Sequence, residues 1–221
     1  MAGTITEMRF QKRNKNRVNI IIDGQYAFGL AAIEAARLRV GQALSDEDIA
    51  RLQAQDEVER AHERALNFLS YRPRSEAEVR TNLRKKNLAD TSIETVIERL
   101  ERAGFLDDRA FARYWVENRM QFNPRGPRAL RYELRAKGVP DSIITGVLAD
   151  LDETTPARKA VQAGARRLSH LEPRDFRRKL KAYLVRRGFS YEVIEPLIEE
   201  ALEAVQRDAP PGIESEGRSN G

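Results

Sequence analysis

Residues 83–100 have the sequence LRKKNLADTSIETVIERL, and residues 134–151 repeat its pattern as LRAKGVPDSIITGVLADL. The two stretches align without a gap at an offset of 51 positions, with Leu83 opposite Leu134. An offset of 50 then places Leu134 opposite Leu184 and carries the same apolar positions into a third copy. Apolar pairs alone match easily by chance, but here a basic helix end and the apolar run after it recur in one register. A fixed period near 50 residues predicts stacked helical units.

Local signals divide each unit into three helices. Pro73 disfavours helix in the residue before it, and Ser75 with Glu78 forms the pattern of a capping box. Gly138 and Gly188 mark helix ends. The expected helices span 57–70, 76–86 and 90–104 in the first unit, 111–120, 128–137 and 143–151 in the second, and 155–168, 174–187 and 191–205 in the third. Pro196, inside the last helix, either kinks it or shortens it.

The segment before these units predicts strands. Residues 4–10 form a weak first strand, and 17–22 and 25–30 are rich in β-branched and aromatic residues. Asp23-Gly24 between the last two is a strong signal for a hairpin with a type I′ turn. Residues 31–42 are expected to be helical, and Ser45 with Asp48 resembles a capping box that opens another helix.

These patterns predict a mainly α protein, with tandem three-helix repeats in an elongated array preceded by a small N-terminal β-hairpin region. The expected domains are an N-terminal β-hairpin and helix region, three repeats and a disordered tail rich in Pro, Gly, Ser and charges. Their boundaries are 1–55, 56–105, 106–152, 153–205 and 206–221.

Composition excludes several classes of protein. The chain has no cysteine, so it has neither a disulfide framework nor a thiolate zinc site. It shows no apolar run of the length that a signal peptide or a membrane span requires. We therefore expect a cytoplasmic protein without membrane contact. The net charge of +5 is a modest hint of a polyanionic partner.

Motifs for catalysis or cofactor binding are missing from the sequence. It contains no GxxxxGK[ST] loop and no GxGxxG turn, and His62 and His170 lack metal-ligand spacing. Asp107 and Asp108 precede a helix, where carboxylates cap backbone N–H groups. Phe111 and Trp115 are expected to pack in a core, whereas the sequence does not decide between core packing and base stacking for Tyr114. We expect no enzyme activity, no catalytic residue, no cofactor and no metal.

Charge alternates between the helices of each unit. The middle segments 72–86, 119–137 and 166–187 carry six, six and nine Lys or Arg residues against two, one and two acids. The third helices of the first and last units are acidic. For any one helix, a solvated face that follows helix-dipole preferences explains this bias. Because the bias recurs, and because arginine's flat fork suits phosphate and carboxylate, we favour a functional basic stripe along one side.

The second unit carries a longer pattern. Gly104-Phe105-Leu106-Asp107-Asp108-Arg109-Ala110-Phe111-Ala112 is followed by Trp115-Val116, Arg119, Gly126, Leu130, Glu133-Leu134 and Lys137-Gly138-Val139. Together with residues 65–75, ALNFLSYRPRS, this pattern resembles the core signature of the RecX family. The likeness covers residues 57–151 well and 155–205 more loosely, and residues 18–30 are similar to N-terminal extensions of some members. Asn87 departs from the pattern, since the second unit has Gly138 there, although asparagine also tolerates a left-handed backbone.

The resemblance implies a regulator, mainly an inhibitor, of the RecA recombinase, acting in DNA repair, homologous recombination and the SOS response. Family members bind the RecA–DNA filament and dampen its ATPase, strand-exchange and co-protease activities. The expected partners are the RecA filament and single- and double-stranded DNA without sequence specificity, and the chain is expected to be a monomer. From charge and repeat position, the predicted RecA- or DNA-binding residues are Arg72, Arg74, Arg84, Lys85, Lys86, Arg125, Arg128, Arg131, Arg135, Lys137, Arg174, Arg177, Arg178, Lys181, Arg186 and Arg187.

Two other interpretations remain open. Helix pairs joined by glycine-bearing turns also suit a helix-turn-helix transcription regulator that binds a specific DNA sequence. A scaffold that binds only protein is the third interpretation. Three successive basic helices suit an extended track better than a single recognition helix does.

Overall fold

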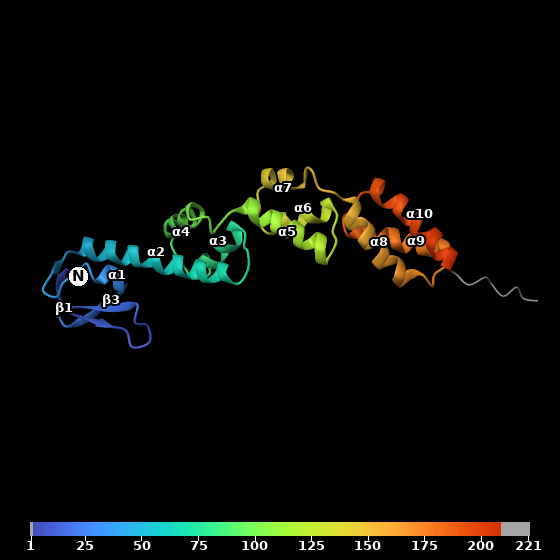
Figure 1. The fold of residues 1–221 in the computed structure, drawn as a ribbon. Coiled ribbons are helices and arrows are strands. Elements are labelled where there is room, and N and C mark those ends of the chain that lie inside the picture. Colours follow the sequence, from blue (N-terminus) through green and yellow to red (C-terminus); the bar gives the residue numbers. More distant parts are fainter. Residues whose placement is uncertain (1, 209–221) are drawn as a thin grey trace, which may run out of the picture. The chain divides into compact units, whose positions relative to one another are not determined.

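The computed structural model describes residues 2–208 and divides the chain into two compact units, Met1–Asp108 and Arg109–Gly221 (Figure 1). The first unit holds a small sheet and one three-helix repeat, and the second holds two three-helix repeats. The mainly α class, the tandem repeats and the N-terminal strand region are therefore confirmed. The elongated arrangement and the domain boundaries stay predictions, and most of the expected disordered tail lies outside the described residues.

The N-terminal sheet has four antiparallel strands in the order β3-β2-β1-β4. The first three are β1 (Gly3–Phe10), β2 (Arg17–Ile22) and β3 (Gln25–Ala31), at the positions that the sequence predicts. Asp23 and Gly24 both have positive φ, 47° and 78°, which confirms the predicted turn geometry. Alternate apolar residues of the strands face a core that includes Ile5, Ile20 and Leu30.

The prediction of a helix over residues 31–42 is wrong for most of that range. Only α1 (Ala32–Ala35) is helical, and the chain then forms β4 (Ala43–Leu44) beside β1. The Gly41 N–H donates to the Ile5 carbonyl, and Gly41 itself has a φ of 89°. Alanine-rich composition favours a helix, but pairing with a strand nearly 40 residues away satisfies the backbone better here.

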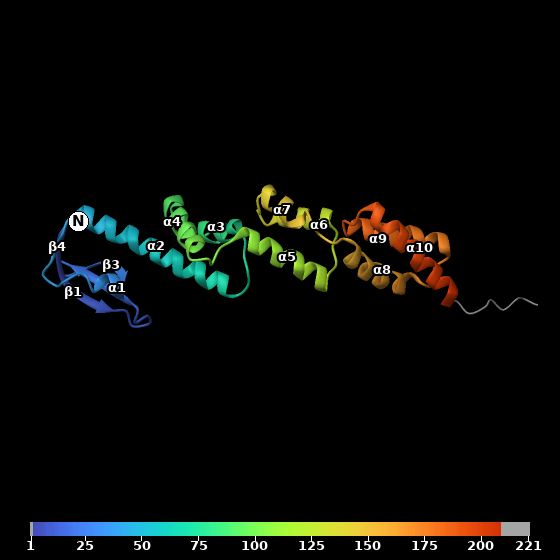
Figure 2. The ribbon, with the colours of Figure 1, turned by 45° about the horizontal axis from the view of Figure 1, so that its top comes forward.

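The next helix, α2 (Asp46–Ser70), is one continuous element (Figure 2). Its predicted capping box of Ser45 and Asp48 is confirmed, but the expected break before Glu57 is absent, so two expected helices are one. Near its middle, the buried Asp56 carboxylate accepts hydrogen bonds from the Arg17 side chain at 2.7 Å and from the Ala31 N–H at 3.2 Å. This contact ties the sheet to the helix that continues into the first repeat.

The three repeats follow one plan. The C-terminal part of α2 is the first helix of the first repeat. In each repeat the chain reverses direction twice, between the first and second helices and between the second and third. The remaining helices are α3 (Glu76–Arg84) and α4 (Asp90–Arg102) in the first repeat, α5 (Asp108–Phe122), α6 (Pro127–Ala136) and α7 (Asp141–Leu148) in the second, and α8 (Thr154–Leu168), α9 (Pro173–Arg186) and α10 (Tyr191–Asp208) in the third.

Specific residues set the ends of these helices. The Ser75 and Glu78 capping box at the start of α3 is confirmed. Asn87, Gly138 and Gly188 have φ values of 56°, 77° and 83°, so the asparagine performs the same left-handed turn as the two glycines. Pro196 lies inside an α10 that continues to Asp208, so it does not shorten the helix.

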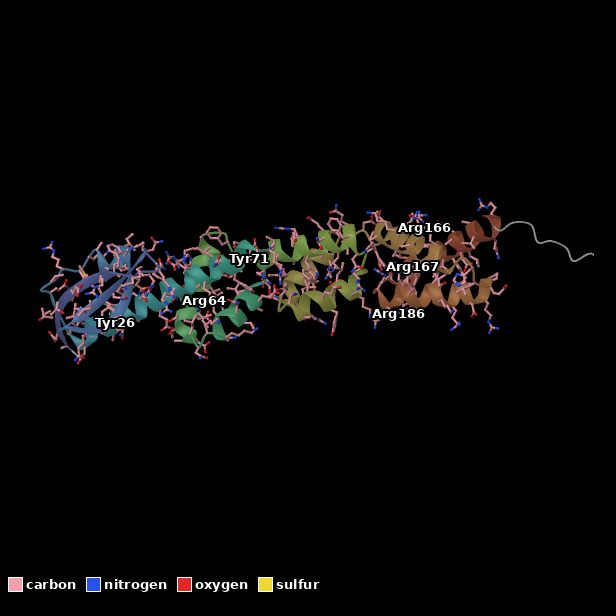
Figure 3. The ribbon with its side chains drawn as sticks, turned by 90° about the horizontal axis from the view of Figure 1, so that it is seen from below. Tyr26, Arg64, Tyr71, Arg166, Arg167 and Arg186 are labelled. Atoms are coloured by element: carbon pink, nitrogen blue, oxygen red, sulfur yellow. The ribbon has the colours of Figure 1, made fainter. Side chains whose placement is uncertain are left out.

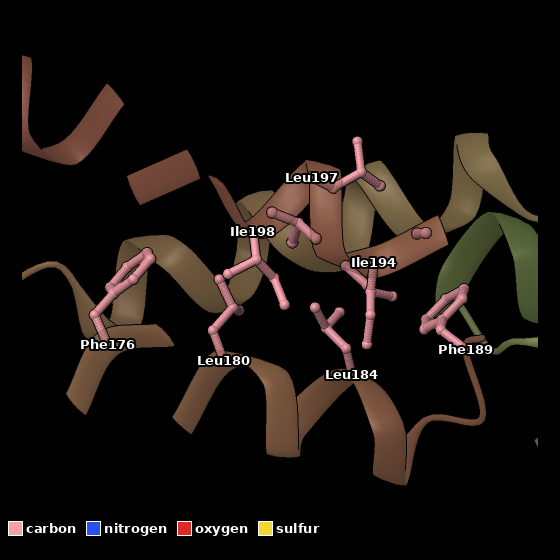
Figure 4. Packing of buried hydrophobic residues seen from close by; sticks show 10 residues of the cluster. Phe176, Leu180, Leu184, Phe189, Ile194, Leu197 and Ile198 are labelled. Atoms are coloured by element: carbon pink, nitrogen blue, oxygen red, sulfur yellow. The ribbon is translucent and has the colours of Figure 1, made fainter. Parts of the chain in front are cut away.

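Each repeat has a separate apolar core. Leu83, Leu134 and Leu184 occupy equivalent positions, and all three side chains are fully buried. Phe111 is buried and Trp115 packs against the core of the second repeat, as predicted. Figure 4 shows the third core, in which Leu180 and Leu184 of α9 face Ile194 and Ile198 of α10.

Asp108 has a role that the sequence does not reveal. The sequence predicts that either Asp107 or Asp108 caps the helix that follows them; the Asp108 Oδ1 accepts a hydrogen bond from the Glu76 N–H at 2.8 Å. It therefore caps the first turn of α3, in the repeat before its own. Burial raises the pKa of Asp108, although the hydrogen bond from Glu76 acts in the opposite direction.

Backbone atoms join the second and third repeats. The Gly126 N–H donates to the Arg187 carbonyl at 2.9 Å, and the Arg128 N–H donates to the Gly188 carbonyl at 3.3 Å. The Arg187 guanidinium adds hydrogen bonds to Asn123 Oδ1 and to the Pro124 carbonyl, both at 2.9 Å. This approach is possible because neither glycine carries a Cβ.

We expect Gly126→Ala to destabilise the second and third repeats. The added Cβ would lie 2.2 Å from the Gly188 carbonyl oxygen, a backbone atom that cannot rotate away. Overpacking of this kind costs about 2 kcal/mol, which thermal unfolding followed by circular dichroism detects. Gly146→Ala, in α7, is the control, because nothing lies within 4 Å of its new Cβ and alanine favours helix. Equal stability of the two variants would show that the close approach of Gly126 and Gly188 does not contribute to the stability of the two repeats.

We expect Asp56→Ala to loosen the sheet from α2. The substitution leaves the Arg17 guanidinium, whose side chain is only 17% exposed, without its counter-charge. Breaking such a pair costs about 3 kcal/mol, so hydrogen exchange of the β2 and β3 amides should accelerate. Glu63→Ala, at an exposed position of the same helix, should leave that exchange unchanged. Full protection of the strands in Asp56→Ala would contradict this account.

Candidate functional site

The middle and third helices of each repeat exchange charged and polar contacts at a constant spacing of 14 residues. Arg80 of α3 binds Glu94 of α4 through two hydrogen bonds. At the equivalent position of the second repeat, Arg131 donates to Thr145 at 3.2 Å. In the third repeat, Lys181 forms an ion pair with Glu195 of α10. In all three repeats, the same repeat position therefore places a cation of the middle helix beside a hydrogen-bond acceptor on the third helix.

A second contact recurs at a spacing of six residues. Arg135, near the end of α6, binds the carboxylate of Asp141 at the start of α7 through two hydrogen bonds of 2.7 and 3.0 Å. Arg84 and Asp90 form the same pair in the first repeat, at 3.3 Å. Acids at helix starts and bases at helix ends also suit the helix dipoles. In the first and third repeats, the pairs across the two helices match the alternation of a basic middle helix with an acidic third helix.

The pairs shift the carboxylates toward their charged form. The hydrogen bond from Arg135 lowers the pKa of Asp141, and the hydrogen bond from Arg80 lowers that of Glu94. Both partners of the Arg135–Asp141 pair are more than half exposed, so solvent screens their attraction. An exposed pair of this kind contributes little to stability, and a phosphate or carboxylate of a partner can replace the intramolecular acid.

Other predicted cations lie on aromatic rings. The Arg74 guanidinium stacks 4.0 Å from the centre of the Phe68 ring, and Lys137 lies 5.1 Å from that of Trp115. Arg187 lies 4.6 Å from Tyr183 as well as bonding to the second repeat. Cation–π contacts and packed stems give these three residues a structural role.

The sixteen predicted contact residues fall into distinct groups. Seven form ion pairs within their own repeat: Arg72, Arg84, Arg125, Arg135, Arg177, Arg178 and Lys181. Arg74, Lys137 and Arg187 contact rings, and Arg131 bonds to a threonine. The other five of the sixteen, Lys85, Lys86, Arg128, Arg174 and Arg186, are exposed and have no ion-pair or ring partner within residues 2–208. The role of all sixteen in binding stays a prediction.

The third repeat carries exposed cations that the sequence prediction missed. Arg166 and Arg167 end α8, and Lys179 lies on α9; none has an ion-pair partner in the described part of the chain. Figure 3 labels Arg166, Arg167 and Arg186 on these neighbouring helices. All three cations lie in the basic segment 166–187, but the prediction did not name them among the contact residues.

Two exposed aromatic rings occupy equivalent positions in the first and second repeats. Tyr71 follows α2 and is 80% exposed, and Phe122 ends α5 and is 72% exposed (Figure 3 labels Tyr71). Each precedes a Pro-Arg corner. Neither ring contributes to a core, so both are available to a partner. Tyr114, which the sequence left open, is 43% exposed.

Residues 2–208 contain no cluster of three or more His, Cys, Asp or Glu side chains arranged to hold a metal ion. His62 is half-buried on α2, where burial lowers its pKa. No helix in the same range combines the length and the apolar character needed to cross a membrane.

Family models for all parts of one architecture match this chain in order. The model described as "Regulatory protein RecX N-terminal domain" matches residues 3–45, so the sheet region is a regular part of that architecture rather than an extension. The models of the first, second and third three-helix domains of RecX match residues 61–100, 107–148 and 157–198.

Individual relatives agree with these matches. "Regulatory protein RecX" of Bacillus subtilis is 37% identical over 201 residues, which cover 89% of this chain and 76% of the relative. The protein of the same name from Bacillus licheniformis is 35% identical over the same shares.

Two solved structures share the fold. "Crystal structure of regulatory protein RecX" superposes with a TM-score of 0.73 at 29% identity and covers 89% of this chain and 99% of its own. "Crystal structure of RecX from Lactobacillus salivarius" has a TM-score of 0.61 at 29% identity, covering 66% of this chain and 97% of its own. The sheet, the three repeats and the matches over most of the chain agree, and this chain belongs to the RecX family.

Proposed function

We propose that this chain is a non-enzymatic regulator of RecA that binds the RecA–DNA filament in the cytoplasm and lowers its ATPase, strand-exchange and co-protease activities. The observation that carries the proposal is the ordered match of four RecX domains along the chain. The curated relatives share the name of regulatory protein.

The distribution of charge supports a filament as the partner. Each repeat presents cations on its middle helix that either have no ion-pair partner among the described residues or form exposed pairs, in which a partner's anions can replace the acid. A RecA–DNA filament offers repeating phosphates and acidic side chains. Contacts to phosphate carry no sequence information by themselves, so this mode of binding is insensitive to DNA sequence.

The first test measures the DNA-dependent ATPase of RecA. RecA of Bacillus subtilis is a suitable target, since a relative in that organism is 37% identical to this chain. We expect ATP hydrolysis to fall progressively as the protein is added, with a clear decrease at stoichiometric amounts. Electron microscopy of the same mixtures should show extra density on the filaments. Unchanged hydrolysis at a stoichiometric excess, or binding to one preferred duplex sequence without RecA, would contradict the proposal.

The second test removes unpaired cations of the middle helices. We expect a fourfold glutamine variant to need several times more protein for the same inhibition, because fewer anions of the filament are neutralised. The variant carries Lys85→Gln, Lys86→Gln, Arg128→Gln and Arg174→Gln. A control with the same change in net charge carries Lys12→Gln, Arg13→Gln, Lys15→Gln and Arg39→Gln, at exposed positions of the N-terminal region. Equal weakening in both proteins would show that only net charge matters.

A further inference from the structure

A hollow of about 390 Å³ lies between α8 and α9 of the third repeat. Arg167 of α8 and Arg178, Lys179 and Arg186 of α9 line it, and none of the lining residues is acidic. Arg178 is paired with Asp175 on its own helix at 3.0 Å. The other three cations are exposed and have no ion-pair partner among the described residues. The hollow therefore holds positive charge that the repeat itself does not neutralise.

Two small residues shape the hollow. Gly164 allows α9 to approach α8 closely, since a Cβ there would lie 2.6 Å from Leu180 Cδ1 and 3.1 Å from the Tyr183 ring. Ala182 lies between Arg178 and Arg186 on one face of α9, at the i+4 spacing that aligns helical side chains. Its short side chain leaves the space between the two arginines open.

The second repeat lacks this arrangement. At the 50-residue offset, Arg178, Ala182 and Arg186 correspond to Arg128, Tyr132 and Ala136. Tyr132 is 76% exposed, so the repeat fold places a bulky ring at this position without difficulty. The fold thus requires neither the alanine nor the second arginine, and a role in binding accounts for both.

We propose that this hollow binds backbone phosphates of DNA. Guanidinium and ammonium groups converging from two helices match the several acceptor oxygens of a phosphate. Arg166 and Arg174, which have no ion-pair partner in the described part of the chain, add positive charge on the same two helices. This favours an extended polyanion over a single carboxylate. The proposal rests on the proposed function, because it assigns the DNA contact of that function to one repeat.

The test compares two charge-matched variants of the full chain. Arg167→Gln with Arg186→Gln removes two cations of the hollow. Lys159→Gln with Arg207→Gln removes two exposed cations outside it that have no ion-pair partner within residues 2–208. Fluorescence anisotropy of a labelled oligothymidine gives Kd between about 50 and 200 mM salt. We expect the hollow variant to bind about tenfold more weakly at low salt, with a log Kd–log salt slope reduced by about 1.4, or about 0.7 for each lost phosphate contact. The control should change far less.

Ala182→Tyr provides an independent variant. It fills the hollow with the residue that the second repeat has at the same position and leaves the charge unchanged. We expect DNA binding to weaken severalfold while the far-ultraviolet circular dichroism stays that of the unmodified chain. Full affinity in both hollow variants would overturn the proposal, as would equal losses in the hollow variant and its control.

Two further readouts identify the ligand. Unlabelled DNA and ATP are compared as competitors of the labelled oligothymidine at equal phosphate concentration. If ATP displaces the oligothymidine as effectively as DNA does, the hollow is a small-anion site and the proposal is wrong. If the hollow variant loses inhibition of RecA while keeping its DNA affinity, the hollow contacts an acidic protein surface, which also overturns the proposal. If the unmodified chain leaves the RecA ATPase unchanged but the hollow variant still loses DNA affinity, the inference holds and the proposed function fails.

Discussion

The reversal of the chain between the second and third helix of each repeat is the constraint on which the remaining contacts depend. Asn87, Gly138 and Gly188 adopt a left-handed backbone at equivalent positions, so each pair of helices folds back in the same way. The reversal brings buried leucines of the middle helix, such as Leu134, against buried isoleucines of the next, such as Ile144. Burial of these side chains supplies most of the stability of such a small unit.

The same reversal also organises the charges. Once the apolar positions are fixed, a cation on the middle helix lies beside a residue 14 positions later, as Arg80 lies beside Glu94 and Lys181 beside Glu195. The face toward the third helix is therefore largely neutral. In the third repeat the face toward the first helix has no such acids, and Arg167 and Arg186 remain unpaired there among the described residues. In the third repeat, α9 thus has a largely neutral face toward α10 and a positively charged face toward α8.

The sequence was sufficient for features governed by local chemistry or by periodicity. The Asp23-Gly24 turn, the capping boxes at Ser45 and Ser75 and the helices of the three repeats all follow from residues within a few positions or from the repeat itself. The helix over residues 31–42 was wrong because the pairing of Ala43 with Thr4 is a long-range contact that no local pattern contains. The break before Glu57 was wrong because a repeat boundary was taken for a helix boundary.

The candidate site was less predictable than the fold. Counting charges located the basic helices but not which cations are neutralised, since that depends on side chains brought together by folding. Arg135 and Arg186 look alike in sequence, yet one is paired with Asp141 and the other lines a hollow. Gly164 and Ala182, two small residues that shape that hollow, carry no charge that a count could detect.

The junction between the second and third repeats has a consequence for how this protein can change. Main-chain atoms of Gly126, Arg128, Arg187 and Gly188 form two of the contacts, and the Arg187 side chain adds two more. The spacing between the start of α6 and the end of α9 therefore does not depend on the other side chains along their outer faces. Substitutions on those faces can alter which anion is recognised while the separation of the two helices stays the same. In this part of the molecule, the chemistry of recognition and the geometry that presents it are free to evolve independently.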